Sequence, residues 1–238
     1  MRSLAELKIK LFADGSNLEQ MRAVAGDPLV SGFTTNPSLC RQAGVKDYES
    51  FAKQALEIVK GKPISFEVFA DDFREMERQT RKIASWGENI YVKIPVTNTR
   101  NESSMNLVRC LSYSGVKVNV TAAMTLEQVR DAAIALDGGA PSIISVFAGR
   151  IADTGVNPVP LMTAAVKMVH GCHNVELLWA SSREVLNIFQ ANDAGCDIIT
   201  VTADLLAKLK TVGKDLRQYS LETVKMFHDD AVESGYVL

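Results

Sequence analysis

The sequence predicts one (β/α)8 TIM barrel domain over residues 1–238. Eight short runs rich in Val, Ile and Phe alternate with longer amphipathic segments from one end of the chain to the other. These runs are almost continuously apolar, as is typical of parallel strands that are covered on both faces. A doubly wound sheet is disfavoured because no glycine-rich phosphate-binding motif follows any run, whereas eight parallel strands close a barrel.

The elements follow one another in a regular βα order. The predicted strands are residues 8–14, 32–37, 64–70, 90–97, 117–123, 142–148, 175–181 and 197–202. Capping-box pairs, which satisfy free backbone N–H groups, predict helix starts at Asp72 with Glu75, Thr99 with Glu102, and Thr125 with Gln128. Glycines predict helix ends at Gly115, Gly138–Gly139, Gly171 and Gly195. After a short helix near 203–210, a last helix at about 220–235 is an appendage that could cover a barrel end or a neighbouring subunit.

The charge balance excludes whole classes of partner. Lys and Arg total 26 and Asp and Glu total 28, so the net charge is −2. Such a chain has no polybasic attraction to nucleic acid or to an anionic membrane surface. No stretch approaches the roughly 20 apolar residues of a membrane span, and the first residues (MRSLAELKIKLF) lack the apolar core of a signal peptide. We therefore expect a cytoplasmic protein whose partners include neither nucleic acid nor membrane.

The cysteines and histidines do not form a recognisable metal site. The cysteines are scattered and are expected to be reduced thiols: Cys40, Cys110, Cys172 and Cys196. His170, Cys172 and His173 lie close together near a helix end, but no matching cluster of ligands accompanies them. The sequence predicts neither a bound metal nor a cofactor.

Polar side chains lie near the predicted C-terminal ends of separate strands, where barrel enzymes have their active sites. They are Asp14, Thr34, Asn36, Glu67, Lys93, Asn119, Thr121, Ser145, Ser181 and Thr202. A purely structural barrel has less need of polar groups on one rim. The sequence therefore predicts an active site at this end of the barrel.

Lys93 is the strongest catalytic candidate, since it lies between apolar residues in the run Ile90–Val96. Lysine is almost never fully buried without a partner or a function. Burial disfavours the charged ammonium, and a neutral amine is a nucleophile toward a carbonyl carbon, which indicates a Schiff-base lysine. The alternative is a lysine whose head reaches solvent or forms a structural ion pair with Glu67. The isolated features favour the two interpretations about equally.

Two carboxylates accompany Lys93. Glu67 lies in the preceding apolar strand and could relay protons with a water and Thr121 during imine formation, although a simple salt bridge to Lys93 is compatible with that role. Asp14 ends the first strand before Gly15, and a turn or helix-cap role is an equally good interpretation of it.

Two arginines follow later strands. Arg150 comes after the strand that contains Ser145. Ser181, Ser182 and Arg183 follow the seventh strand, where we expect the next helix to begin. Barrels often bind phosphate at loops late in the chain and at helix N-termini, where hydroxyl and guanidinium donors can act together. Each arginine could instead form an ordinary surface ion pair. Together they suggest an anionic sugar-phosphate substrate.

A series of segments along nearly the whole chain resembles the transaldolase family, in particular its small subgroup that also contains fructose-6-phosphate aldolase. The segments are Phe12-Ala13-Asp14, Thr34-Thr35-Asn36-Pro37-Ser38, Phe66-Glu67-Val68, Val92-Lys93-Ile94-Pro95, Asn119-Val120-Thr121, Ser145-Val146-Phe147-Ala148-Gly149-Arg150 and Ala180-Ser181-Ser182-Arg183. They occur in the family's order, and the combination of T-T-N-P-S with V-K-I-P is highly specific.

The resemblance implies a class I mechanism without metal. Lys93 would form an imine with a ketose, and Asp14 would take the C4 hydroxyl proton so that the C3–C4 bond breaks and a three-carbon enamine remains. The other residues implied are Glu67 and Thr121 for a catalytic water; Thr34, Asn36, Asn119, Ser145 and Phe147 around the three-carbon unit; and Arg150, Ser181 and Arg183 for the phosphate. It also implies a homo-oligomer, a decamer or pentamer, with the C-terminal helix between subunits.

Two positions favour a transferase over an aldolase within the subgroup. The aldolase branch typically has Gln where this chain has Glu67, and Tyr where it has Phe147. The chain departs from the family at Ala122–Thr125, Ser182 and Thr202–Ala203, which border the expected pocket. We therefore expect an anionic substrate that need not be the usual sugar phosphate of the family. The alternatives are a lyase of the fructose-6-phosphate aldolase type that uses free dihydroxyacetone and, more remotely, a catalytically inactive sugar-phosphate-binding barrel.

Overall fold

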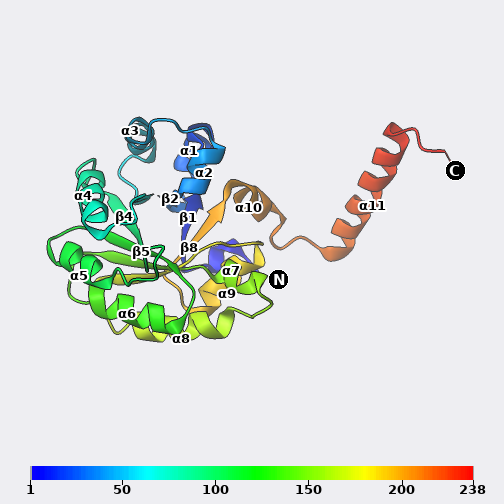
Figure 1. Cartoon of the computed structure of the whole chain (residues 1–238). Coiled ribbons are helices and arrows are strands. Elements are labelled where there is room, and N and C mark those ends of the chain that lie inside the picture. Colours follow the sequence, from blue (N-terminus) through cyan, green and yellow to red (C-terminus); the bar gives the residue numbers. More distant parts are fainter. Residues whose placement is uncertain (1, 238) are drawn as a thin grey trace.

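The computed structural model describes residues 2–237 and confirms the predicted barrel. All eight strands are parallel and pair in sequence order, with β8 closing onto β1. Helices surround the barrel on the outside (Figure 1). None of the described helices is long and apolar enough to cross a bilayer.

Each predicted strand is present, with ends that differ by a few residues. The strands are β1 (Lys10–Asp14), β2 (Val30–Thr34), β3 (Ile64–Glu67), β4 (Ile90–Pro95), β5 (Val118–Ala123), β6 (Ser142–Val146), β7 (Val175–Trp179) and β8 (Ile198–Thr202). The largest difference is at β2, which begins and ends earlier than predicted. It ends at Thr34 because Asn36 caps the next helix and Pro37 is that helix's first residue, where proline's missing N–H is not needed.

The helices follow the predicted order. They are α1 (Leu18–Ala25), α2 (Pro37–Gln42), α3 (Tyr48–Val59), α4 (Phe73–Ala84), α5 (Met105–Tyr113), α6 (Leu126–Leu136), α7 (Ala148–Asp153), α8 (Val159–Val169), α9 (Leu186–Ala194), α10 (Ala203–Lys208) and α11 (Leu216–Glu233), with short 3-10 helices at Leu4–Glu6 and Leu209–Thr211. Helices α5, α6, α8 and α9 each end one or two residues before a predicted glycine stop.

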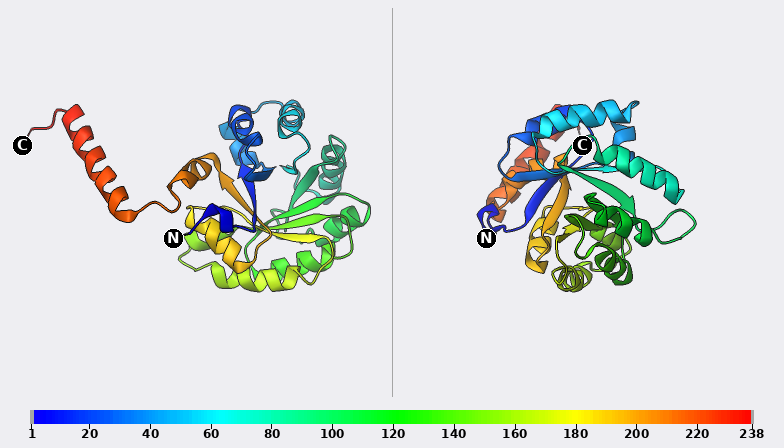
Figure 2. Two further views of the ribbon diagram at one scale, coloured as in Figure 1. Left: turned by 180° about the vertical axis from the view of Figure 1, so that it is seen from behind. Right: turned by 90° about the vertical axis from the view of Figure 1, so that its left-hand side faces the viewer.

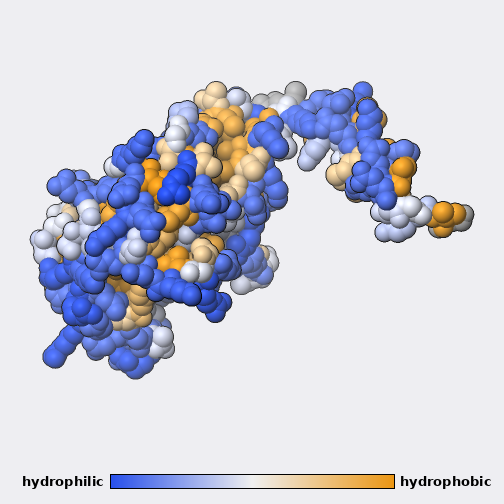
Figure 3. All heavy atoms as spheres, turned by 90° about the horizontal axis from the view of Figure 1, so that it is seen from above, coloured by the Kyte–Doolittle hydropathy of each residue, from blue (hydrophilic) through white to orange (hydrophobic). Residues whose placement is uncertain are grey.

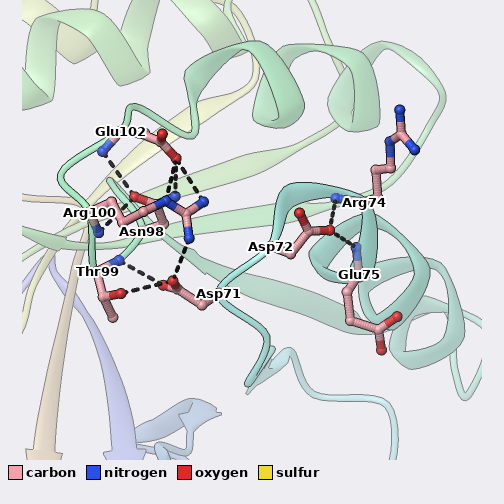
Figure 4. Close-up of polar contacts among 8 residues, drawn as sticks. All are labelled: Asp71, Asp72, Arg74, Glu75, Asn98, Thr99, Arg100 and Glu102. Atoms are coloured by element: carbon pink, nitrogen blue, oxygen red, sulfur yellow. Dashed lines mark hydrogen bonds and ion pairs between the residues drawn. The ribbon is translucent and has the colours of Figure 1, made fainter.

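Two of the three predicted helix starts are confirmed. Thr125 forms a complete capping box at α6, and the Asp72 carboxylate accepts hydrogen bonds from the first turn of α4. The start at Thr99 is wrong, because α5 begins only at Met105. The Thr99 backbone N–H and hydroxyl instead donate to Asp71 at 2.7 and 2.8 Å, and Arg100 contacts both Asp71 and Glu102 (Figure 4). Residues 96–104 therefore form a loop that is joined to the loop after β3.

The barrel interior contains apolar side chains from the neighbouring strands β6, β7, β8 and β1. Phe12, Ile143, Leu178, Ala180 and Ile198 form an inner apolar cluster, separate from the larger core between strands and helices. A Cβ atom at position 32 would lie 2.5 Å from the Phe12 ring, so glycine at this position makes room for that ring. This packing closes the barrel below its C-terminal rim.

Helix α11 extends away from the barrel. It begins at Leu216, a few residues earlier than predicted, and the segment before it carries it clear of the other helices (Figures 1 and 2). None of its described residues is buried. Apolar side chains are visible along this projecting arm (Figure 3).

Candidate active site

The polar strand ends meet around a cavity of about 590 Å³ at the C-terminal rim. The predicted site residues that line it are Asp14, Thr34, Asn36, Glu67, Lys93, Thr121, Ser145, Phe147, Arg150, Ser181, Arg183 and Thr202. Asn119 is the exception, since it is fully buried and is absent from the lining. The structure thus brings the predicted residues together but places one of them below the cavity.

Lys93 and Glu67 form the buried centre of the site. They are direct register partners on the paired strands β3 and β4, which explains their proximity. Lys93 Nζ lies 3.0 Å from Glu67 Oε2 and donates to the backbone oxygen of Thr35 at 2.9 Å. Lys93 is only 6% exposed, so its head does not reach bulk solvent. The ion pair fits both the Schiff-base interpretation of Lys93 and the alternative of a structural ion pair. The short distance between the two groups allows a proton to pass from one to the other.

Asp14 is part of the site and is not a helix cap. Asn17 caps α1, whereas Asp14 Oδ1 accepts a hydrogen bond from the Thr34 hydroxyl at 2.7 Å. Burial raises the pKa of the Asp14 carboxyl; the charge of Lys93 and the hydrogen bond from Thr34 oppose this shift. A carboxylate with a raised pKa is a better proton acceptor than an ordinary surface aspartate.

Thr200 is a site residue that the sequence reasoning missed. Its hydroxyl lies 2.6 Å from the Thr34 hydroxyl, and both residues are buried. Because the Thr34 hydroxyl donates to Asp14, its oxygen can accept from Thr200, whose hydroxyl also lies 3.4 Å from the Phe12 backbone oxygen. The available signal was strand periodicity, because Thr200 lies two residues before Thr202 and so faces the same side of β8.

Thr121 and Ser145 differ in how their hydroxyls are satisfied. Thr121 Oγ1 is buried and has no hydrogen-bond partner within residues 2–237. Ser145 Oγ donates to Asn119 Oδ1 at 2.7 Å, and Asn119 Nδ2 donates to Ser65 Oγ at 3.1 Å. Asn119 therefore orients Ser145 from below, whereas Thr121 has a hydroxyl left for a ligand or a water.

Asn36 has two functions in the structure. Its Oδ1 accepts the hydrogen bond that caps α2, from the Leu39 N–H at 3.0 Å. The residue also lines the cavity, where its Nδ2 group can donate to a hydroxyl or a carbonyl. The cap fixes the orientation of the amide.

The two arginines lie at the same side of the cavity but in different surroundings. The guanidinium of Arg150 lies over the Phe147 ring, with Cζ 5.2 Å from the ring centroid. Arg183 forms a two-point ion pair with Asp153, the last residue of α7. This pair matches the surface-pair alternative for Arg183 without removing the side chain from the cavity.

The prediction that Ser181–Arg183 begin a helix is wrong. Helix α9 begins at Leu186, and the three residues belong to the preceding loop. The Arg183 N–H donates to Asn187 Oδ1 at 2.8 Å, so it is not available to a phosphate. Ser181 has a φ of 65° and comes so close to Gly149 that a Cβ there would lie 1.5 Å from the Ser181 oxygen. Glycine at 149 is therefore required by this close approach.

The histidines lie outside the site. His170 contacts Asp197, and His173 contacts Asp137. Within residues 2–237, no three His, Cys, Asp or Glu side chains form a group that could hold a metal ion.

Comparison with known proteins identifies the family. The model of the transaldolase/fructose-6-phosphate aldolase family matches residues 11–236. This chain belongs to that family. The matched residues contain β2 to β8 and all of β1 except its first residue, Lys10. The transaldolase/fructose-6-phosphate aldolase family model therefore spans the barrel described above.

Curated relatives support the same family assignment. A probable transaldolase of Methanococcus maripaludis is 36% identical over 203 residues, which are 84% of this chain and 89% of the relative. A probable transaldolase of Streptococcus equi subsp. zooepidemicus is 35% identical, with 84% and 90% covered. One from Lactiplantibacillus plantarum is 36% identical, with 84% and 88% covered.

Similarity to a distant solved structure shows the fold. A mandelate oxidase variant superposes with a TM-score of 0.58 and 18% identity, over 92% of this chain and 76% of that chain. At 18% identity this similarity shows a shared barrel fold and gives no information about the reaction.

Proposed function

We propose that the chain is a transaldolase that transfers a dihydroxyacetone unit from a ketose phosphate, such as sedoheptulose 7-phosphate or fructose 6-phosphate, to an aldose phosphate. The observation that carries this proposal is Lys93 in contact with Glu67 at the cavity, with Asp14 on the same lining. An amine beside one carboxylate, with a second carboxylate nearby, supplies the nucleophile and the two proton acceptors that the reaction needs.

The first step would form an imine on Lys93. Lys93 Nζ passes a proton to Glu67 across their 3.0 Å contact, and the neutral amine then attacks the ketose C2 carbonyl. The carbinolamine loses its hydroxyl as water when Glu67 returns the proton. The buried Thr121 hydroxyl is suited to hold this water, because it has no partner within the described residues.

The second step would break the C3–C4 bond. Asp14 takes the proton of the C4 hydroxyl, C4 becomes the carbonyl carbon of the leaving aldose, and the bond electrons move to C3 and the imine to give an enamine. The enamine then attacks the carbonyl carbon of the acceptor aldose, and Asp14 returns its proton to the new hydroxyl. Addition of water to the resulting imine releases the new ketose and free Lys93.

The remaining polar groups would bind the substrate. Asn36 lines the cavity and offers its amide N–H groups to the hydroxyls of the three-carbon unit. Ser145 donates its own proton to Asn119, which orients it, so its oxygen would accept a hydrogen bond from a substrate hydroxyl. Ser181, Arg150 and Arg183 would bind the phosphate, since guanidinium groups donate well to phosphate oxygens.

The expected reaction is transfer, so product formation should depend on an acceptor. Fructose 6-phosphate alone should yield glyceraldehyde 3-phosphate only slowly, and addition of erythrose 4-phosphate should raise the rate of its formation by at least about 10-fold. The reason is that Phe147 offers no hydroxyl to position a water that protonates the enamine, and Glu67 replaces the glutamine typical of the aldolase branch. A coupled dehydrogenase assay measures glyceraldehyde 3-phosphate. Equal rates with and without acceptor would show a lyase instead.

We also propose that the protein is a homo-oligomer in which α11 packs against another copy of the chain. The exposed large apolar residues of α11 are Leu216, Tyr219, Leu221, Val224, Met226, Phe227 and Val232. A monomer would leave these side chains in water, where their burial against a neighbour is favourable.

Light scattering should therefore give a mass of at least two copies of the 26.0 kDa chain. The double substitution Val224→Asp and Phe227→Asp should reduce that mass, because a buried unpaired carboxylate is costly. Lys225→Asp with His228→Asp changes the neighbouring positions of the same helix and should keep the assembly. A monomeric wild type, or equal dissociation of both variants, would contradict this arrangement.

A further inference from the structure

We propose that Asp153 is a positioning residue that sets the preference for phosphorylated substrates by holding Arg183 in its phosphate-binding orientation. The inference rests on the proposed sugar-phosphate function. Arg183 lines the cavity, whereas Asp153 is not part of the lining. Asp153 therefore acts through the arginine and not by contact with the substrate.

The ion pair between them has two-point geometry. Arg183 Nε donates to Asp153 Oδ1 at 3.0 Å, and Nη2 donates to Oδ2 at 2.6 Å. The hydrogen bond from Arg183 and the charges of Arg183 and Arg150 lower the pKa of the Asp153 carboxyl, so it stays ionised near neutral pH. Exposed ion pairs usually stabilise little, but two-point arginine–carboxylate pairs are the exception because they fix the geometry of the arginine.

This pairing decides which donors of Arg183 remain for a ligand. A guanidinium has five N–H groups in one plane. Asp153 takes the edge formed by Nε and one hydrogen of Nη2. The Nη1 group and the second hydrogen of Nη2 remain, and they form the other edge of the same plane. That edge is a ready fork for two oxygens of a phosphate.

The backbone of Arg183 is fixed as well. Its N–H and that of Glu184 both donate to Asn187 Oδ1, at 2.8 and 3.2 Å. The adjacent Ser182 hydroxyl donates to the Thr200 backbone oxygen at 2.7 Å. Both ends of the Arg183 side chain are therefore held before any ligand arrives. A phosphate then pays less of the rotamer entropy of a free arginine.

Calorimetric binding of sorbitol 6-phosphate tests this inference, because the ligand has the phosphate but no carbonyl and cannot form an imine. Asp153→Ala is expected to raise its Kd by about 3- to 10-fold, as the two-point pair is lost. Asp153→Asn keeps one acceptor, so its Kd should lie between those of the wild type and Asp153→Ala.

In ketose turnover, Asp153→Ala should raise KM for fructose 6-phosphate with little change in kcat, and should leave KM for unphosphorylated fructose unchanged.

Asp193→Ala is the matched control. Asp193 forms a two-point pair with Arg2 at 2.8 and 2.5 Å, with side chains 47% and 53% exposed. The corresponding values for Asp153 and Arg183 are 52% and 48%. Neither Asp193 nor Arg2 lines the cavity, so this variant should bind sorbitol 6-phosphate as the wild type does.

The positioning role also requires that the effect depend on Arg183. In an Arg183→Ala background, Asp153→Ala should cause no further loss of affinity. An unchanged or tighter Kd in Asp153→Ala, the same loss in the Arg183→Ala background, or a wild type that does not bind sorbitol 6-phosphate would overturn the inference. A wild type that binds this ligand but does not turn over ketoses would refute the proposed function alone, since the binding comparison does not use Lys93.

Discussion

Lys93→Met is expected to lower ketose turnover by more than about 10⁴-fold, because the imine nitrogen is removed and no other group can replace it. Methionine keeps most of the volume of the buried stem. The barrel should therefore still fold, although Glu67 loses its 3.0 Å ion-pair partner. Turnover of fructose 6-phosphate with erythrose 4-phosphate measures the loss, and circular dichroism checks the fold.

Lys53→Met is the control for removal of a lysine–carboxylate pair. Lys53 forms a 2.9 Å pair with Glu49 on the exposed surface of α3. Its loss should leave turnover unchanged, since exposed pairs of this kind stabilise little. Substantial turnover by folded Lys93→Met would rule out a Schiff base at this position.

Asp14→Asn is expected to lower kcat by about 10²- to 10⁴-fold, the usual contribution of a general base. Asparagine keeps the shape and can still accept the Thr34 hydrogen bond of 2.7 Å, but it cannot take the C4 hydroxyl proton. Imine formation on Lys93 should persist, because that step uses Glu67. Rapid borohydride reduction of the Asp14→Asn variant should therefore still label the protein.

The raised pKa of Asp14 also predicts opposite effects of pH on activity and on stability. The base must be ionised, so wild-type activity should fall as the pH decreases through this raised value. Burial favours the protonated form of the Asp14 carboxyl, so this group contributes its full stabilisation only below the ordinary aspartate pKa of 3.8. The stabilisation is lost as the pH rises through the raised pKa of the folded state. Asp14→Asn should lack that loss and should have a higher Tm at pH 7 than the wild type.

Asp204→Asn provides the comparison for these pH effects. Asp204 is an exposed carboxylate in the first turn of α10, directly after β8. Its substitution should leave the activity–pH profile and the Tm unchanged. An Asp14→Asn variant with wild-type kcat, or with the acid limb of the profile intact, would exclude Asp14 as the base.

The features that were predictable from the sequence are those that depend on strand order and periodicity. Once parallel strands follow one another, Glu67 and Lys93 must lie near each other at one rim, and they are direct register partners. Burial of Lys93 followed from its apolar neighbours, and it is observed.

The features that were not predictable depend on loop geometry and on contacts between distant segments. The pair Thr99 and Glu102 has the spacing of a capping box, but Asp71 from another loop binds Thr99 instead. Asp153 ends α7 and Arg183 lies in the loop before α9, with a helix and a strand between them in the sequence. Only the three-dimensional arrangement of α7 and that loop brings the two side chains together. Local sequence contains no information about such pairs.

The most direct test of the account is borohydride reduction in the presence of fructose 6-phosphate, followed by peptide mass mapping. A reduced three-carbon adduct is expected on Lys93 in the wild type and should be absent from Lys93→Met. No adduct, or an adduct on another lysine, would contradict the proposed mechanism.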